Sequence, residues 1–138
     1  MIIADTNVVS ELMKDRPARA VVAWAQSLRA ADLTISVVTV EEIEWGLGRL
    51  PTGKRRFDLE RRWHKLVDAF RDAIVVYDVA AAGATAAVLV DADDGGHPMG
   101  LADAQIAGIC LASGARLATR NVRDFERVAG LALVNPFD

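Results

Sequence analysis

The chain has 138 residues, of which 52% are hydrophobic and 25% are charged, and its formal net charge at pH 7 is −3. This size and composition predict one globular domain over residues 1–138, and the acidic balance argues against a protein that coats nucleic acid through its overall charge. The only cysteine, Cys110, excludes an internal disulfide and a zinc cluster, and no apolar run approaches the length of a membrane span. We therefore expect a cytoplasmic protein without membrane contact.

Short apolar runs alternate with segments of helical periodicity along the chain. The expected strands are 2–4, 33–36, 74–77, 116–118 and 131–134. The expected helices are 8–13, 17–30, 39–50, a basic helix that includes 59–70, then 79–90, 101–113 and 122–128. Residues 91–100, with Gly95-Gly96 and Pro98, are expected to form a loop, and Gly114 is expected to end the helix before it. Strands that alternate with helices predict an α/β fold, with a mostly parallel sheet of four to five strands and helices on both faces.

Four acidic residues stand where segments leave the predicted strands or where helices begin. Asp5 directly follows the first strand, and Glu42 is expected in the first turn of the helix after the second strand. Asp103 is expected in the first turn of the helix after the glycine- and proline-rich loop, and Asp124 follows the fourth strand. Because segments that leave parallel strands emerge at the same edge of a sheet, these carboxylates can converge. Their oxygens suit Mg²⁺ or Mn²⁺, which keep water ligands for a substrate phosphate.

Each of these acidic residues also has a simpler structural explanation. Asp5 is a favoured N-cap residue, and acidic side chains in a first helical turn are stabilised by the helix dipole. On the residues alone, the metal-site and the capping interpretations remain equally open. Gly46 favours the metal site, because it lies one turn after Glu42, where a missing side chain would let another group approach.

Other chemistries have little support in the sequence. The histidines His64 and His97 have no obvious nucleophile beside them, so a catalytic triad is not expected. No glycine-rich phosphate-binding loop is present. Cys110 lies in an apolar helical segment and is expected to be a buried, unreactive thiol.

A basic segment runs from Arg49 to Arg71 and contains eight basic and three acidic residues. Such a segment is compatible with a surface that binds an RNA backbone or a partner protein, although a simple solvated helix face is the alternative. The residues proposed for this surface are Lys54, Arg55, Arg56, Arg61, Arg62 and Lys65.

Five segments, taken together, resemble the PIN-domain ribonucleases, and most of all the VapC-type toxins of bacterial toxin–antitoxin pairs. The segments are MIIADTN at 1–7, SVVTVEEIEWG at 36–46, LADAQIA at 101–107, ATRNVRDF at 118–125 and NPF at 135–137. They extend from one end of the chain to the other, in the order and spacing of that family. The resemblance implies a PIN-like three-layer α/β/α sandwich and an endoribonuclease that depends on Mg²⁺ or Mn²⁺.

The resemblance also implies roles for single residues. Asp5 and Asp103 match the family's metal ligands, Glu42 its third acid, and Asp124 or Asn121 the fourth corner of the site. Many PIN domains have an acid where this chain has Asn121, which leaves the fourth position and a second metal ion open. Polar contacts to the acids or to metal-bound waters are expected from Thr6, Asn7 and Thr119.

Partners follow from the same resemblance. It implies an RNA substrate, a cognate small antitoxin that wraps the toxin, and a homodimer or a toxin–antitoxin hetero-oligomer. Two other classes remain open: a phosphohydrolase that uses the same acids on small phosphate substrates, and a non-catalytic PIN-like module that binds RNA or protein.

Overall fold

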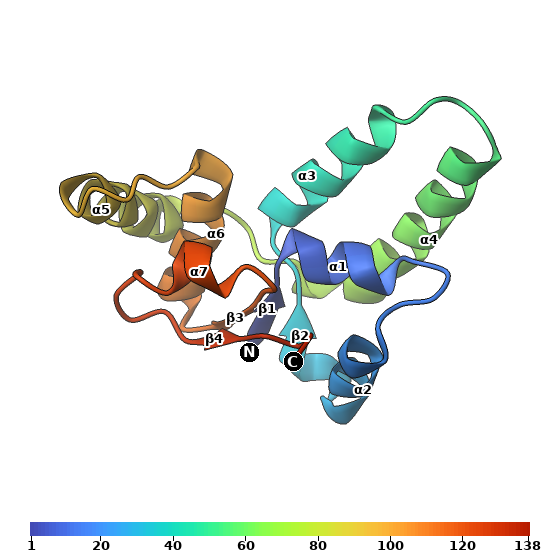
Figure 1. Cartoon of the computed structure of the whole chain (residues 1–138), viewed down its shortest axis with the longest axis horizontal. Helices are drawn as coiled ribbons and strands as arrows, with labels where there is room; N and C mark the ends of the chain where they lie inside the picture. The colour runs from blue at the N-terminus through green and yellow to red at the C-terminus, as the bar shows by residue number, and fades with distance from the viewer.

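The computed structural model covers residues 1–138 and is built around one four-stranded sheet in which every pair of strands is parallel (Figure 1). The strand order is β2-β1-β3-β4. The strands are β1 (Ile2–Ala4), β2 (Leu33–Thr34), β3 (Arg116–Ala118) and β4 (Leu133–Val134). The predicted α/β class and mostly parallel sheet of four to five strands are therefore confirmed, with four strands present.

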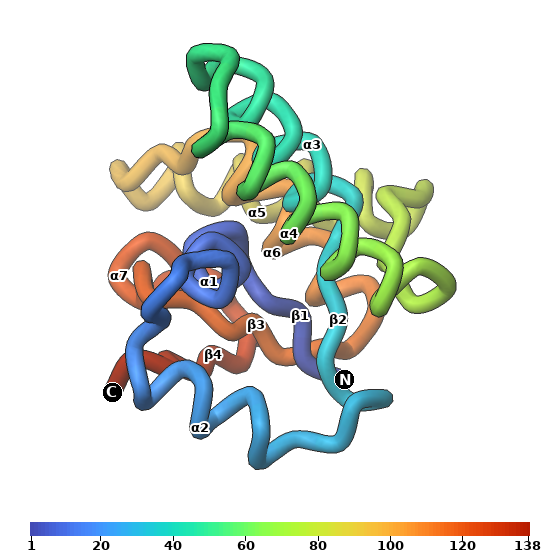
Figure 2. Tube along the Cα trace, turned by 90° about the vertical axis from the view of Figure 1, so that its right-hand side faces the viewer, coloured from blue at the N-terminus to red at the C-terminus, as the bar shows by residue number.

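Helices cover both faces of the sheet, as the three-layer prediction requires. One side carries α1 (Thr6–Leu12), α2 (Arg19–Ser27), α3 (Val37–Gly48) and α4 (Lys54–Phe70). The other side carries α5 (Val79–Asp94), α6 (Leu101–Ser113) and α7 (Val122–Phe125). There are also two 3₁₀ turns. The first, η1 (Ala30–Asp32), lies between α2 and β2, and the second, η2 (Arg71–Ala73), directly follows α4. Figure 2 shows α3 and α4 side by side, standing away from the sheet.

Two apolar cores lie on the two faces of the sheet because side chains alternate along β1. Ile2 and Ala4 belong to the core beneath α1 to α4, whereas Ile3 belongs to the core beneath α5 and α6. Trp63 of α4 fills the first core and Phe125 of α7 fills the second, and both side chains are almost completely buried. These two cores fix the helices from which the site residues project.

Two predicted elements differ from the structure. The strand expected at 74–77 is wrong: only Val75 pairs, in a single parallel bridge to Ser36, because the chain leaves η2 at Ala73 and enters α5 at Val79. The loop expected to begin at residue 91 begins later, because α5 continues to Asp94. The glycines and the proline on which the loop prediction depends all lie after Asp94, so the helix extends up to them.

Other boundaries move by a few residues, as helix and strand ends commonly do. Gly114 ends α6 in the left-handed conformation, with φ of 67°, as the sequence predicts. None of the helices combines the length and hydropathy that a membrane crossing requires.

Candidate active site

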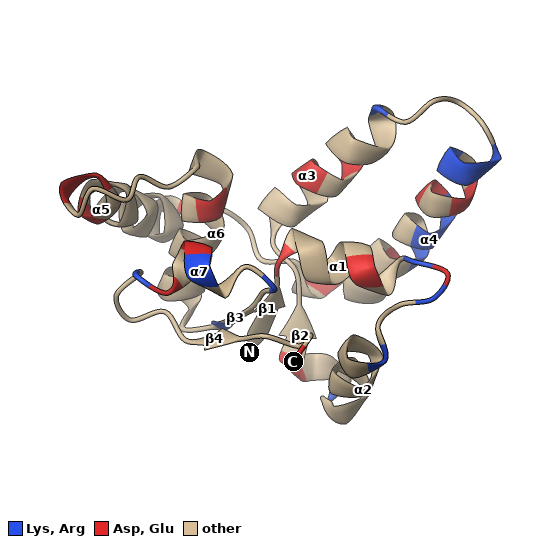
Figure 3. Ribbon diagram, in the orientation of Figure 1, with Lys and Arg blue, Asp and Glu red and all other residues tan.

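The four predicted acids come from four separate segments: Asp5 lies between β1 and α1, Glu42 in α3, Asp103 in α6 and Asp124 in α7. Figure 3 shows acidic positions on the ribbon of α3, α6 and α7. The raised pKa of Asp103, in the first turn of α6, shows that the four acids converge. Burial raises the pKa of its carboxyl group to about 6, and the negative charges of the other three acids contribute to that rise. The contributing charges are those of Asp5, Asp124 and Glu42, in that order. Asp5 and Asp103, which lie 98 positions apart in sequence, thus interact electrostatically.

Asp5 is the most firmly held member of the site. Its Oδ1 accepts a hydrogen bond from the Thr6 backbone N–H at 2.7 Å, which caps α1. Its Oδ2 accepts from Asn7 Nδ2 at 3.1 Å and from Thr119 Oγ1 at 2.8 Å. Burial raises the pKa of Asp5 and the charge of Glu42 adds to this, although the three hydrogen bonds act in the opposite direction. Capping and site formation are therefore both properties of this one carboxylate.

Glu42 is tied to α1 through a threonine hydroxyl. Thr6 Oγ1 donates to Glu42 Oε1 at 2.6 Å and lies 3.2 Å from Thr39 Oγ1. Because the single hydroxyl proton of Thr6 goes to the carboxylate, Thr39 is the donor in the second contact. Glu42 lies in the second turn of α3, not the first, because that helix already begins at Val37 with Ser36 as its N-cap.

The segment after β3 completes the hydrogen-bond network around Asp5. Thr119 is fully buried, and its hydroxyl accepts from the Asn121 N–H at 3.0 Å while it donates to Asp5. Asn7 Oδ1 accepts from the Arg120 N–H at 3.1 Å. The predicted contacts of Thr6, Asn7 and Thr119 to the acids thus exist in the structure.

The remaining predicted positions are less tightly joined. Asp103 and Asp124 make no side-chain hydrogen bond, and the Asn121 amide is exposed and makes none either. Thr39 is a buried polar residue that the sequence prediction missed; its signal was a threonine within an otherwise apolar first helical turn. No atom of the chain itself approaches Gly46, since a Cβ built there has no neighbour within 4 Å, so the close approach expected at Gly46 stays a prediction.

The donor set has the chemistry of a site for a hard cation. All of its charged members are carboxylates, accompanied by threonine hydroxyls and an asparagine amide. No three His, Cys, Asp or Glu side chains approach closely enough to hold a metal ion on their own. Mg²⁺ commonly takes only one or two carboxylates and fills its other positions with water. The residues present therefore fit a water-rich site.

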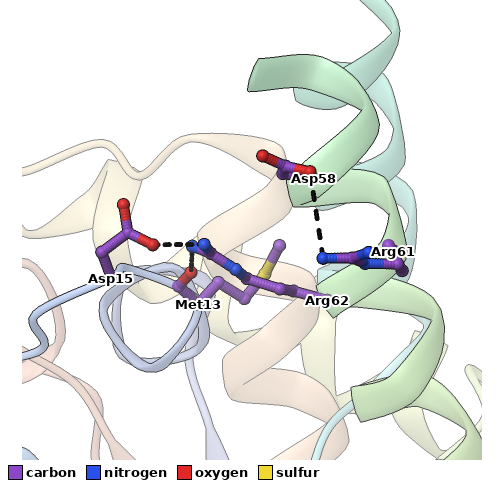
Figure 4. A network of polar contacts seen from close by, with 5 residues as sticks. All are labelled: Met13, Asp15, Asp58, Arg61 and Arg62. Atoms are coloured by element: carbon purple, nitrogen blue, oxygen red, sulfur yellow. Dashed lines mark hydrogen bonds and ion pairs between the residues drawn. The ribbon is translucent and has the colours of Figure 1, made fainter. Parts of the chain in front are cut away.

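Three of the six predicted basic residues of α4 form ion pairs within the chain, and Figure 4 shows two of them, Arg61 and Arg62. Arg62 donates to the Met13 carbonyl oxygen at 2.9 Å and pairs with Asp15, which joins α4 to the end of α1. Arg61 lies 3.9 Å from Asp58. Arg56 pairs with an acid on its own helix at 2.6 Å and also donates to a backbone carbonyl. The basic residues exposed and without an ion pair are Lys54, Arg55 and Lys65.

Comparison with known proteins places the chain in a family. The sequence model of the PIN domain family matches residues 2–131, and the chain belongs to that family. It is 37% identical to the VapC ribonuclease Y4jK of Sinorhizobium fredii, over 100% of this chain and 99% of that protein. It is 33% identical to Toxin FitB of Neisseria gonorrhoeae, over 99% of each. The crystal structure of FitAcB from Neisseria gonorrhoeae matches the fold with a TM-score of 0.90 at 33% identity, over 99% of both chains. The VapC-type resemblance of the five sequence segments is confirmed.

Proposed function

We propose that this protein is a toxin ribonuclease that cleaves RNA with the help of Mg²⁺ or Mn²⁺ and is neutralised by a cognate small antitoxin. The observation that carries the proposal is the buried Asp5 carboxylate, held by Thr6, Asn7 and Thr119 at an edge where three other acids converge. Its relatives support the same activity, since one is named a VapC ribonuclease and another a toxin.

Asp5 and Asp103 are the residues that would hold the cation. When bound, a divalent cation lowers the pKa of a water molecule and stabilises negative charge on the leaving oxygen of a phosphodiester. Glu42, oriented by the Thr6 hydroxyl, would orient the attacking water. Asp124 is the better candidate for the fourth corner than Asn121, because its charge acts on Asp103 whereas the Asn121 amide points to no partner.

The cleavage test compares carboxylate-to-amide variants at the site with a neighbour outside it. Asp5→Asn and Asp103→Asn are expected to lower Mg²⁺-dependent cleavage of single-stranded RNA by at least about 100-fold, because each removes a carboxylate that would hold the cation, and the cation stabilises the transition state. Glu42→Gln is expected to impair cleavage, whereas the exposed neighbour Glu41→Gln should not. Circular dichroism would check that each variant is folded. Full activity of both aspartate variants with Mg²⁺ present would contradict the mechanism.

Two measurements separate the proposal from its rivals. A phosphohydrolase of small substrates would turn over phosphomonoesters with Mg²⁺ but leave RNA intact. A non-catalytic binding module would show no divalent-ion binding in titration calorimetry and no cleavage. A toxin ribonuclease is expected to bind the ion, cut RNA and lose activity when its antitoxin is added.

Assembly belongs to the same proposal. We propose that the protein is cytoplasmic and forms a homodimer or, with its antitoxin, a hetero-oligomer; the similarity to Toxin FitB supports the toxin role on which this assembly depends. Light scattering of the protein, alone and with its antitoxin, would measure the mass of each assembly.

A further inference from the structure

A groove of about 880 Å³ opens beside the proposed cleavage site, and its lining comes mainly from α5, the loop 95–100 and the segment of α7 and residues 127–129. Figure 1 shows where α5, α6 and α7 lie in the fold. One wall is α5 with the loop 95–100, and the other is α7 with residues 127–129. Asp103 and Asp124 both belong to its lining. The volume lies in the range of about 300–1,000 Å³ that is usual for ligand pockets. An RNA strand bound at Asp103 and Asp124 would therefore have this groove next to it.

The groove offers apolar surface that the acids do not use. Val88 of α5, Met99 of the loop, and Val128 after α7 line it, together with Leu111 of α6. Val88 is part of the second core, and the other three pack against that core, so the lining is fixed by the fold. Apolar side chains of this kind hold an unstacked base by contact with its faces.

Two arginines of the groove are free to bind an anion. Arg123 and Arg127 are exposed, line the groove, and take part in none of the ion pairs of the structure. A guanidinium group binds phosphate oxygens in a bidentate manner. Asp91, at the α5 end, is the only carboxylate of the lining outside the acidic site and would repel a phosphate there. The two arginines outnumber Asp124 at the α7 end, whereas Asp91 stands without an arginine at the α5 end, so the charges favour a phosphate at the α7 end and leave the α5 end for a base.

We propose that this groove binds one nucleotide of single-stranded RNA next to the cleaved phosphodiester. Its base lies against Val88, Met99 and Val128, and its phosphate faces Arg123 and Arg127. The inference rests on the proposed ribonuclease function and adds a substrate subsite to it. RNA is favoured over a protein segment because the groove is continuous with the acids that act on the phosphodiester.

The first test uses cleavage kinetics on a fluorescent single-stranded RNA. Arg123→Gln combined with Arg127→Gln is expected to raise KM about 10-fold with little change in kcat, because charge-assisted contacts to the bound strand are lost. The salt dependence of KM should become shallower by about 0.7–1 in log–log slope for one lost phosphate contact. The matched control, Arg19→Gln with Arg116→Gln, changes two exposed arginines outside the groove and should leave KM unchanged.

The second test examines the base. Substrates that carry an abasic ribose at one position at a time are expected to lose affinity at a single position next to the cleaved bond. Met99→Ala should lose affinity for the intact RNA but be insensitive to the abasic change at that position, because both remove the same contact.

The outcomes separate this subsite from the ribonuclease activity itself. If the unaltered protein cleaves RNA and the arginine pair changes KM no more than its control, the subsite is wrong and the activity stands. If the pair retains its KM but loses affinity for the antitoxin, the groove is a protein-binding surface and the proposal is overturned. A protein that neither binds nor cleaves RNA overturns both.

Discussion

Asp5 and Asp103 are held in different ways, although both are expected to bind the same cation. Asp5 accepts three hydrogen bonds, so its orientation is set by the fold. Asp103 makes no side-chain hydrogen bond, and burial together with neighbouring negative charge raises its pKa to about 6. The cation-free protein therefore contains a carboxyl group whose ionised form is disfavoured.

This predicts a stability that depends on pH. The pKa of Asp103 is higher in the folded protein than its ordinary value of 3.8, so the folded state binds more protons between these two values. The contribution of protonated Asp103 to the free energy of unfolding is therefore at its maximum at low pH and is lost as the pH rises through about 6. Asp103→Asn, which has no charge to repel, should therefore stabilise the protein above this pH.

Thermal unfolding in the presence of a chelator measures the effect. At pH 8, Asp103→Asn is expected to raise Tm by a few degrees, which corresponds to about 1 kcal/mol once solvent screening of this partly exposed group is allowed for. At pH 4 the difference should vanish. The exposed Asp72→Asn serves as the control. An equal difference at both pH values, or a lower Tm at pH 8, would show that Asp103 is not repelled.

At the scale of elements, the contact between α5 and α6 sets the position of Asp103. A Cβ atom built on Gly108 of α6 would lie 2.1 Å from Thr85 Oγ1 and 2.8 Å from the Ala81 carbonyl oxygen of α5. The Thr85 hydroxyl itself donates to that carbonyl at 2.8 Å. Only glycine permits this approach, since backbone atoms of α5 would have to move to make room.

Two glycine substitutions should have opposite effects on stability. Gly108→Ala is expected to lower the free energy of unfolding by about 1–3 kcal/mol, because the added methyl group overpacks the contact. Gly46→Ala places a methyl group in open space on an exposed turn of α3 and is expected to raise it by about 0.5–1 kcal/mol. Urea denaturation measures both values. If Gly108→Ala left the free energy of unfolding unchanged, α5 and α6 could move apart without loss of stability, and the overpacking explanation would be wrong.

The sequence predicts the convergence of the acids because the rule depends only on strand direction. Asp5 and Asp103 are placed correctly once the strands are known to be parallel. The local sequence pattern fails where contacts between distant segments decide the outcome. It indicates a close approach at Gly46 and none at Gly108, because it cannot show which glycine faces another helix. It also cannot show that Arg62 pairs with Asp15, 47 residues away, and so is used within the fold. The groove depends on the course of the loop 95–100, which no periodicity reveals.

At the scale of the whole molecule, both cores share β1, and we infer that residues 1–138 unfold as one unit. The molecule is acidic overall, with an acidic site at the sheet edge and a basic face on α4. The free cations of that face are Lys54, Arg55 and Lys65. We propose that this face attracts the RNA backbone from outside the cleavage site.

Charge reversal tests the basic face. Lys54→Glu, Arg55→Glu and Lys65→Glu together are expected to weaken RNA binding and to make its salt dependence shallower, because fewer counterions are released. Arg62→Gln should instead lower stability, since it breaks the link from α4 to the Met13 carbonyl. Fluorescence anisotropy at several salt concentrations measures binding. Unchanged affinity and slope in the triple variant would leave a partner protein as the ligand of this face.

Helix α1 has a consequence for mutagenesis of the site. It has only seven residues, too few to be stable alone, and it is held by Asp5 at its start and by Arg62 near its end. Asparagine caps helices as well as aspartate, whereas alanine does so poorly. The variant Asp5→Ala would therefore combine fraying of α1 and loss of catalysis in one measured effect. The asparagine variant keeps an oxygen that can cap α1, so it removes the charge with less effect on the helix, although its amide nitrogen replaces one of the two acceptor oxygens.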